Sequence, residues 1–214
     1  MRHPSGPASI LHKPLDEILG SRGNVGVLRV LCRHGGPLPT RSVADRSRLT
    51  RQGIKKALDQ LVALGIVEPV GQGRSLLYEL NEEHPLATAI TGLFRAETAR
   101  VDALFDLIRR TAESLRPPPL AIWLYGSAAR REDHAGSDLD LAVVGDSREI
   151  AEQSAALEDA LLQVSESWTI RPSIITLTPA DVKRHARERT AFWKNLERDA
   201  IPIYGATLGR IADG

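Results

Sequence analysis

The 214-residue sequence contains a single cysteine, Cys32, so it cannot form an intramolecular disulfide or a metal cluster held by several cysteines. Such sparse cysteine is typical of a reducing compartment, and we expect the cytoplasm. No apolar run approaches the roughly 18 residues that a membrane-spanning helix needs. No apolar stretch follows Arg2 either, so the pattern does not predict a secretory signal. We expect a protein without a membrane partner.

The small net charge of +1 conceals an asymmetry along the chain. Residues 1–80 hold 12 Lys or Arg and 6 Asp or Glu, whereas residues 81–214 hold 16 and 21. A basic front and an acidic back indicate two modules with different partners. The basic module favours a polyanionic partner.

Residues 1–20 contain several prolines and are expected to form a flexible arm. Beyond them, apolar spacing and glycine turns predict three helices and then two strands, at 24–34, 40–46, 50–64, 66–70 and 75–80. This order over residues 21–82 resembles the winged helix-turn-helix domains of DNA-binding regulators.

The resemblance implies that the third helix enters the major groove of double-stranded DNA. We expect contacts to bases and phosphates from the side chains of Arg48, Arg51, Gln52, Lys55 and Lys56, and from Arg74 in the wing. One such module makes few contacts, so a homodimer on a two-fold related site is expected. The alternative is a winged domain that docks a protein or dimerises.

Residues 83–116 have a helical apolar pattern and are expected to form a connector of one long helix or two shorter ones, which is a candidate dimer element. A triple proline then marks a second module over residues 117–214. Its pattern alternates strands with helices, predicted at 120–125, 139–144, 147–165, 170–177, 181–197 and 201–204. The chain as a whole is therefore expected to be α+β or α/β.

The second module contains two short motifs in a defined order. The first is Leu124-Tyr125-Gly126-Ser127-Ala128-Ala129-Arg130, and the second is Ser137-Asp138-Leu139-Asp140-Leu141. Glycine permits a sharp turn after a strand, and the helix start that follows can bind phosphate oxygens. Two carboxylates spaced two apart on a strand point to one face, where they can hold metal ions.

Together these motifs resemble the DNA polymerase β-like nucleotidyltransferases, in particular the minimal members of that superfamily. The resemblance implies a mixed sheet flanked by helices, a nucleoside triphosphate and Mg²⁺ or Mn²⁺. It assigns Asp138 and Asp140 to catalysis and metal binding. It assigns nucleotide binding to Gly126, Ser127, Arg130 and Ser137.

One position departs from the superfamily, which usually supplies a third carboxylate from the next strand. Ser173 falls about where that acid would lie, and a serine hydroxyl replaces it poorly at neutral pH. Glu166 or Asp181 could substitute, although both lie outside the predicted strand.

Two functions are therefore open. The first is a DNA-binding nucleotidyltransferase that transfers a nucleoside monophosphate to a protein or RNA hydroxyl, by analogy with self-regulating antitoxins. The second is a transcription regulator whose nucleotidyltransferase domain is catalytically weak or only senses nucleotide. A drug-modifying enzyme is disfavoured, because it has no need of a DNA-binding module.

Overall fold

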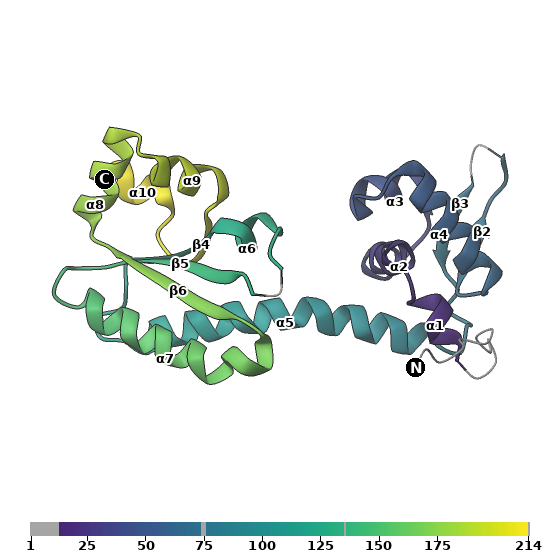
Figure 1. Ribbon diagram of the computed structural model, residues 1–214, viewed down its shortest axis with the longest axis horizontal. Coiled ribbons are helices and arrows are strands. Elements are labelled where there is room, and N and C mark those ends of the chain that lie inside the picture. Colours follow the sequence, from purple (N-terminus) through teal and green to yellow (C-terminus); the bar gives the residue numbers. More distant parts are fainter. Residues whose placement is uncertain (1–12, 74–75, 135, 214) are drawn as a thin grey trace, which may run out of the picture. The chain divides into compact units, whose positions relative to one another are not determined.

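A computed structural model describes residues 13–73, 76–134 and 136–213 (Figure 1). The chain divides into two compact units, one ending at Arg100 and the other beginning at Val101. Among the described residues, no helix is both long and apolar enough to cross a membrane.

The N-terminal unit combines helices with a small antiparallel sheet of strand order β1-β3-β2. Side-chain caps start two of its helices: the hydroxyl of Ser21 accepts from the Asn24 amide, and that of Thr50 accepts from the Gly53 amide. The elements are α1 (Pro14–Ile18), α2 (Arg22–His34), β1 (Leu38–Pro39), α3 (Thr40–Ser47), α4 (Arg51–Ala63), β2 (Val67–Val70) and β3 (Leu77–Leu80).

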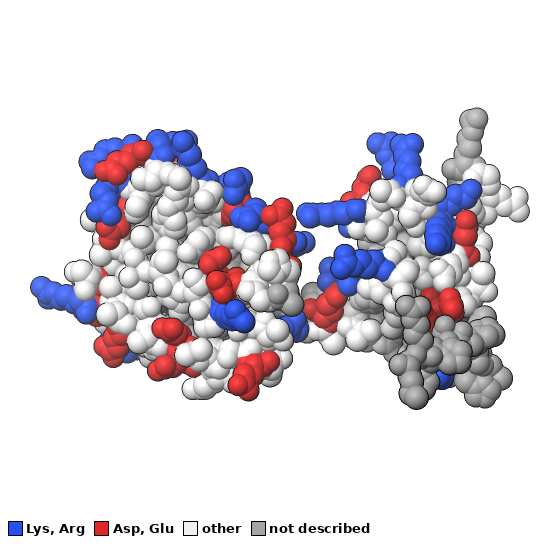
Figure 2. Space-filling view, viewed as in Figure 1, with Lys and Arg blue, Asp and Glu red and all other residues white. Residues whose placement is uncertain are grey.

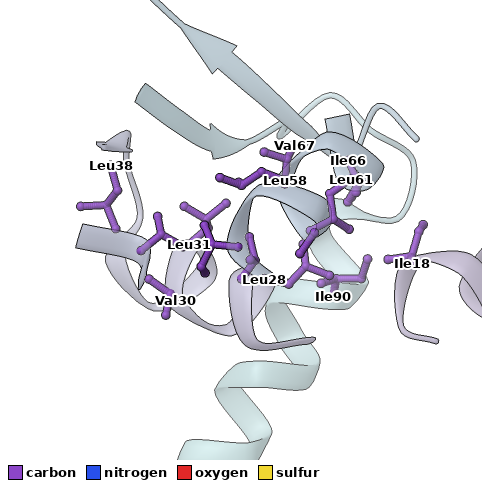
Figure 3. Packing of buried hydrophobic residues seen from close by; sticks show 14 of the residues in the cluster. Ile18, Leu28, Val30, Leu31, Leu38, Leu58, Leu61, Ile66, Val67 and Ile90 are labelled. Atoms are coloured by element: carbon purple, nitrogen blue, oxygen red, sulfur yellow. The ribbon is translucent and has the colours of Figure 1, made fainter. Parts of the chain in front are cut away.

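One apolar core holds this unit together (Figure 3). Apolar residues three and four apart form one stripe on each of α2 and α4, and the two stripes face each other across the core. The labelled core side chains are Ile18, Leu28, Val30, Leu31, Leu38, Leu58, Leu61, Ile66, Val67 and Ile90. The charged faces of these helices are left to solvent.

The expectation of a flexible arm over residues 1–20 is wrong for its last part. Residues 14–18 form helix α1, and Ile18 is only 1% exposed. The Asn24 side-chain amide donates a 2.9 Å hydrogen bond to the Glu17 carbonyl, which ties α1 to α2. Proline at the first helical position favours this short helix. Residues 1–12 lie outside the described part of the chain.

The predicted connector is one continuous helix, α5 (Ala87–Ser114), and the boundary between the units falls inside it. Its first half buries Ile90 and Phe94 in the N-terminal core. Its second half buries Ile108 and Ala112 in a core of the C-terminal unit. The apolar stripe therefore serves as core, and the homodimer stays a prediction.

The C-terminal unit is a four-stranded mixed sheet of order β6-β5-β4-β7, flanked by helices as predicted. Strands β5 and β6 are parallel, and the other neighbours are antiparallel. The elements are β4 (Ala121–Tyr125), α6 (Gly126–Arg130), β5 (Asp138–Val144), α7 (Ile150–Trp168), β6 (Arg171–Leu177), α8 (Pro179–Glu188), α9 (Ala191–Asp199), β7 (Ile201–Gly205) and α10 (Leu208–Asp213).

Each face of this sheet has its own core. Helices α5 and α7 cover one face, where Leu141 and Leu161 are fully buried. Helices α8, α9 and α10 cover the other, where Trp123 and Trp193 pack. The prediction of one helix over 181–197 is wrong. Helix α8 ends before Arg189, whose φ is 51°, and the Thr190 hydroxyl caps the start of α9.

Candidate active site

Two carboxylates stand at the first residues of β5. Asp138 and Asp140 alternate with Leu139 and Leu141, so both point to the sheet face that α8 to α10 cover. The leucines are buried in the opposite core. Asp138 is exposed and Asp140 is half-buried, because β5 enters the sheet at this point.

Gly126 makes room for the second carboxylate. It follows β4 with a φ of 74°, a left-handed conformation that is strained for any residue with a side chain. A Cβ atom at this position would lie 3.1 Å from the Cγ atom of Asp140 and closer still to its Oδ2 atom. The neighbouring residue of β4, Tyr125, pairs in register with Asp140. The glycine is thus required both by the turn and by the close approach of the carboxylate.

The protonation of Asp140 reflects this setting. Partial burial raises its pKa above the ordinary aspartate value, and the negative charge of Asp138 raises it further. The hydroxyl of Ser173 and the positive charge of Arg130 act in the opposite direction. A cation that enters the site would therefore lower the pKa of Asp140.

Ser173 lies directly beside Asp140, because the parallel register of β5 and β6 pairs these two residues. The position where the superfamily usually carries its third acid is thus filled by a hydroxyl. Asp181 does not substitute: it lies beyond the far end of β6, where it completes the capping box of α8 with Thr178 and pairs with Arg184 at 2.8 Å. Glu166 is exposed near the end of α7.

Arg130 is held in place by an acid that the sequence motifs do not contain. Its Nη1 atom lies 2.8 Å from the Oδ2 atom of Asp199, and its Nε atom lies 2.8 Å from Glu132. Asp199 ends α9, and only 3% of its side chain is exposed. Arg198 grips the same carboxylate through two hydrogen bonds of 2.7 and 2.8 Å.

The two guanidinium groups explain the ionisation of Asp199. They lower the pKa of this carboxyl to about 2, with Arg198 the larger influence. Two cations thus share one carboxylate on the Asp140 side of the sheet. Sequence inspection missed Asp199 and Arg198, since they follow the motifs by about sixty residues and the only local signal is an Arg-Asp pair before a strand.

The two predicted serines have structural partners. Ser127 lies in the single turn of α6, and its carbonyl accepts from the Glu132 amide at 3.0 Å. The Ser137 hydroxyl accepts from the His134 amide at 3.0 Å, which closes the turn before β5. Ser127 thus bonds through its backbone and Ser137 through its side chain.

Among the described residues, no group of three His, Cys, Asp or Glu side chains is placed to hold a metal ion. The two carboxylates of β5 suit one Mg²⁺ ion, which commonly takes one or two carboxylates and completes its shell with water and phosphate oxygens. They do not by themselves suit a pair of ions.

The predicted DNA-binding residues belong to the N-terminal unit. The exposed face of α4 carries Arg51, Gln52, Lys55 and Lys56. Arg48 ends α3 with a φ of 56° and is also exposed. Figure 2 shows Lys and Arg side chains in several places on this unit. Arg74 lies outside the described residues.

Residues 108–205 match the sequence model of the family described as "Polymerase beta, Nucleotidyltransferase". This stretch runs from the second half of α5 to the end of β7 and includes all four strands of the mixed sheet. The C-terminal unit therefore contains a nucleotidyltransferase domain of the polymerase β type, whose family-level activity is nucleotidyl transfer. Among curated proteins, none matches the chain.

Proposed function

We propose that the C-terminal unit binds a nucleoside triphosphate with one divalent cation and transfers its nucleoside monophosphate to a hydroxyl group. The observation that carries this proposal is the packing of Asp140 against Gly126, beside Asp138 on the same sheet face. Arg130, which Asp199 fixes, is close enough to act electrostatically on Asp140.

The chain's own residues have separate tasks in this proposal. Asp138 and Asp140 would hold the cation, which would neutralise phosphate charge as it develops. Arg130, which Asp199 keeps from turning away, would contact the phosphates. The acceptor hydroxyl attacks the α-phosphorus, the bond to the β-phosphate oxygen breaks and pyrophosphate leaves. The hydroxyl proton passes to a carboxylate or to water.

A thermal unfolding experiment tests this site. All three tryptophans, Trp123, Trp168 and Trp193, lie in the C-terminal unit, so their fluorescence follows that unit alone. A triphosphate at about 100 times its dissociation constant adds roughly 2.7 kcal/mol to stability. We expect one of the four nucleoside triphosphates to raise the transition temperature, and only with Mg²⁺ or Mn²⁺.

The variant Asp138→Asn/Asp140→Asn should lose this metal-dependent rise. The matched control is Asp102→Asn/Asp159→Asn, which removes two exposed carboxylates from the same unit and should keep it. Equal nucleotide-dependent shifts in both variants would remove the carboxylates of β5 from the site.

A second candidate function is favoured by Ser173, the serine that replaces the third acid. In that case the domain senses the nucleotide without efficient transfer, and the regulator acts through its N-terminal unit. Release of pyrophosphate in the presence of candidate protein or RNA acceptors separates the two functions. Nucleotide binding without release of pyrophosphate in the presence of these acceptors favours the sensor.

We further propose that the N-terminal unit is a winged helix that binds double-stranded DNA, with a homodimer as the binding species. Its support is the division of α4, whose Ile54, Leu58 and Leu61 are buried while its cationic side chains are exposed. The two strands that follow, β2 and β3, form the hairpin expected of a wing.

The DNA proposal is tested by the salt dependence of binding. Removal of one cation that neutralises a phosphate should reduce the slope of log affinity against log salt by about 0.9. We therefore expect Lys55→Ala/Lys56→Ala to weaken duplex binding and flatten the slope by roughly 1.8. The control Lys183→Ala/Lys194→Ala removes two exposed charges from the other unit. Equal slopes in the two variants would exclude the α4 lysines from the interface.

A further inference from the structure

A surface cavity of about 270 Å³ in the N-terminal unit is lined almost entirely by basic and small residues. It lies where α2 meets the end of α3, and none of its lining residues belongs to α4. Its lining residues are Gly26, Arg29, Val30, Arg33, His34, Arg46 and Ser47. No acidic residue is among them.

Part of this positive charge is already balanced by one acid on α5. Arg29 binds Glu97 through two hydrogen bonds of 2.7 and 2.8 Å, and its guanidinium also lies 5.4 Å from the centre of the Phe94 ring. Arg33 reaches the same carboxylate at 3.3 Å. One carboxylate thus serves two guanidiniums, which leaves an unbalanced positive charge at the cavity.

The remaining basic pair has no acid between its members. The Nη1 atom of Arg46 lies 3.1 Å from the Nδ1 atom of His34. A guanidinium is always protonated, so it donates and the imidazole nitrogen accepts. None of the salt bridges among the described residues includes Arg46. The cavity therefore has a surplus of about two positive charges.

Helix ends account for some of these residues but not for all. Cations stabilise the last turn of a helix, where Arg33, His34 and Arg46 lie. Arg29 is more than one turn from the end of α2. Gly26 leaves no room for a larger side chain in the lining, since a Cβ atom there would lie only 3.2 Å from the Cδ1 atom of Leu49.

We propose that this cavity binds a multiply charged phosphate-type oxyanion. Guanidinium groups match phosphate oxygens with paired hydrogen bonds. Liquid water takes about 30 Å³ per molecule, so a cavity of 270 Å³ has room for a diphosphate. The oxyanion can come from the backbone of DNA or from a free nucleotide or pyrophosphate, and in either case Arg33 and Arg46 would hold it from opposite helices.

Titration of the full-length protein with pyrophosphate, in EDTA at low salt and followed by calorimetry, tests the proposal without DNA. The result for the cavity is therefore independent of the proposed DNA binding. We expect Arg33→Ala/Arg46→Ala to weaken pyrophosphate binding at least tenfold, since both phosphate-facing forks are removed. Arg33→Lys/Arg46→Lys keeps the charge and should weaken binding less. Lys183→Ala/Lys194→Ala removes the same charge from exposed residues outside the cavity and should bind pyrophosphate as the wild type does.

Equal affinity for pyrophosphate in the wild type and Arg33→Ala/Arg46→Ala would overturn the proposal. So would an equal loss in Lys183→Ala/Lys194→Ala, because net charge alone would then explain binding. Pyrophosphate bound in the C-terminal unit is recognised separately, by a shift in the tryptophan-monitored transition.

Adding a DNA duplex to the same titration identifies the source of the oxyanion. If excess duplex displaces pyrophosphate from the wild-type protein, the cavity takes a backbone phosphate. If duplex and pyrophosphate bind together, and Arg33→Ala/Arg46→Ala loses only pyrophosphate, its ligand is a free anion. Both results support a phosphate-type ligand.

Discussion

The candidate DNA-binding cations of the N-terminal unit and Arg130 of the C-terminal unit differ in how they are held. In the N-terminal unit, the salt bridges of the described residues include none to Arg48, Arg51, Lys55 or Lys56. In the C-terminal unit, Arg130 is fixed by carboxylates. Loose cations suit a partner whose phosphates lie along a surface, whereas a fixed cation suits one triphosphate in one orientation.

Helix α5 sharpens this comparison, because it contributes to both cores. Phe94 packs in one unit and Ile108 in the other. The same helix therefore supports both the unit with the exposed α4 cations and the unit with Arg130. The difference therefore lies between two sets of cations: those on the exposed face of α4 have no salt bridge among the described residues, whereas Arg130 has two. A substitution that removes an ion pair in one unit should change the stability or ligand binding of that unit and leave the other unit unchanged.

The largest effect is expected from Gly126→Ala. A left-handed φ of 74° and the close approach of Asp140 both oppose a Cβ atom. Strain and overpacking together should lower the free energy of unfolding of the C-terminal unit by about 2–5 kcal/mol and abolish metal-dependent nucleotide binding. Urea unfolding followed by tryptophan fluorescence measures the loss.

Gly136→Ala is the control for backbone strain alone. Gly136 has a φ of 96°, but nothing lies within 4 Å of a Cβ atom there. We expect it to cost only about 1–2 kcal/mol. If the two variants are equally stable, the contact between Gly126 and Asp140 does not constrain the site.

Local pattern was sufficient to predict most elements, because apolar spacing and glycine turns act within a few residues. The resemblance to the superfamily, and not local pattern, placed Ser173 beside the two aspartates, and the parallel register pairs it with Asp140. The pattern could not supply Asp199, since its role depends on how the end of α9 meets α6. The pairing of Arg29 with Glu97 likewise joins residues 68 positions apart.

Two local errors have physical causes as well. The helical pattern continues through Arg189, but the cap formed by Thr190 starts a new helix there. Prolines in residues 1–20 suggested an arm, yet Ile18 contributes to the core. Long-range burial overrides local propensity in such cases.

A smaller effect, with a defined pH dependence, is expected from Asp199→Asn. The pKa of Asp199 in the folded protein, about 2, lies below the ordinary value near 3.9. This carboxylate therefore stabilises the fold above about pH 4, and its contribution is lost as the pH falls towards 2. The variant should be less stable at pH 7, and the difference from the wild type should shrink in that window.

The same variant removes the ion pair between Arg130 and Asp199. Arg130 would then be less fixed, as the cations of α4 are. We expect a weaker apparent affinity for triphosphate, measured as a smaller nucleotide-dependent rise in transition temperature. Glu197→Gln is the control, because Glu197 pairs with the exposed Arg189 at 3.0 Å, away from Arg130. A pH-independent difference between Asp199→Asn and the wild type would contradict the assigned role.

The smallest effect on stability, and the most informative for chemistry, is expected from Ser173→Asp. The new carboxylate would lie beside Asp140 in the parallel register. Without divalent cations, like charges on neighbouring strands should destabilise the unit by up to about 1 kcal/mol. With Mg²⁺ this loss should be reversed, because three carboxylates can hold a pair of cations, whereas two suit only one. Ser173→Asn gives the uncharged control. If Mg²⁺ stabilises both variants equally, then Ser173 does not occupy the metal-facing position, and the sensor function loses its main support.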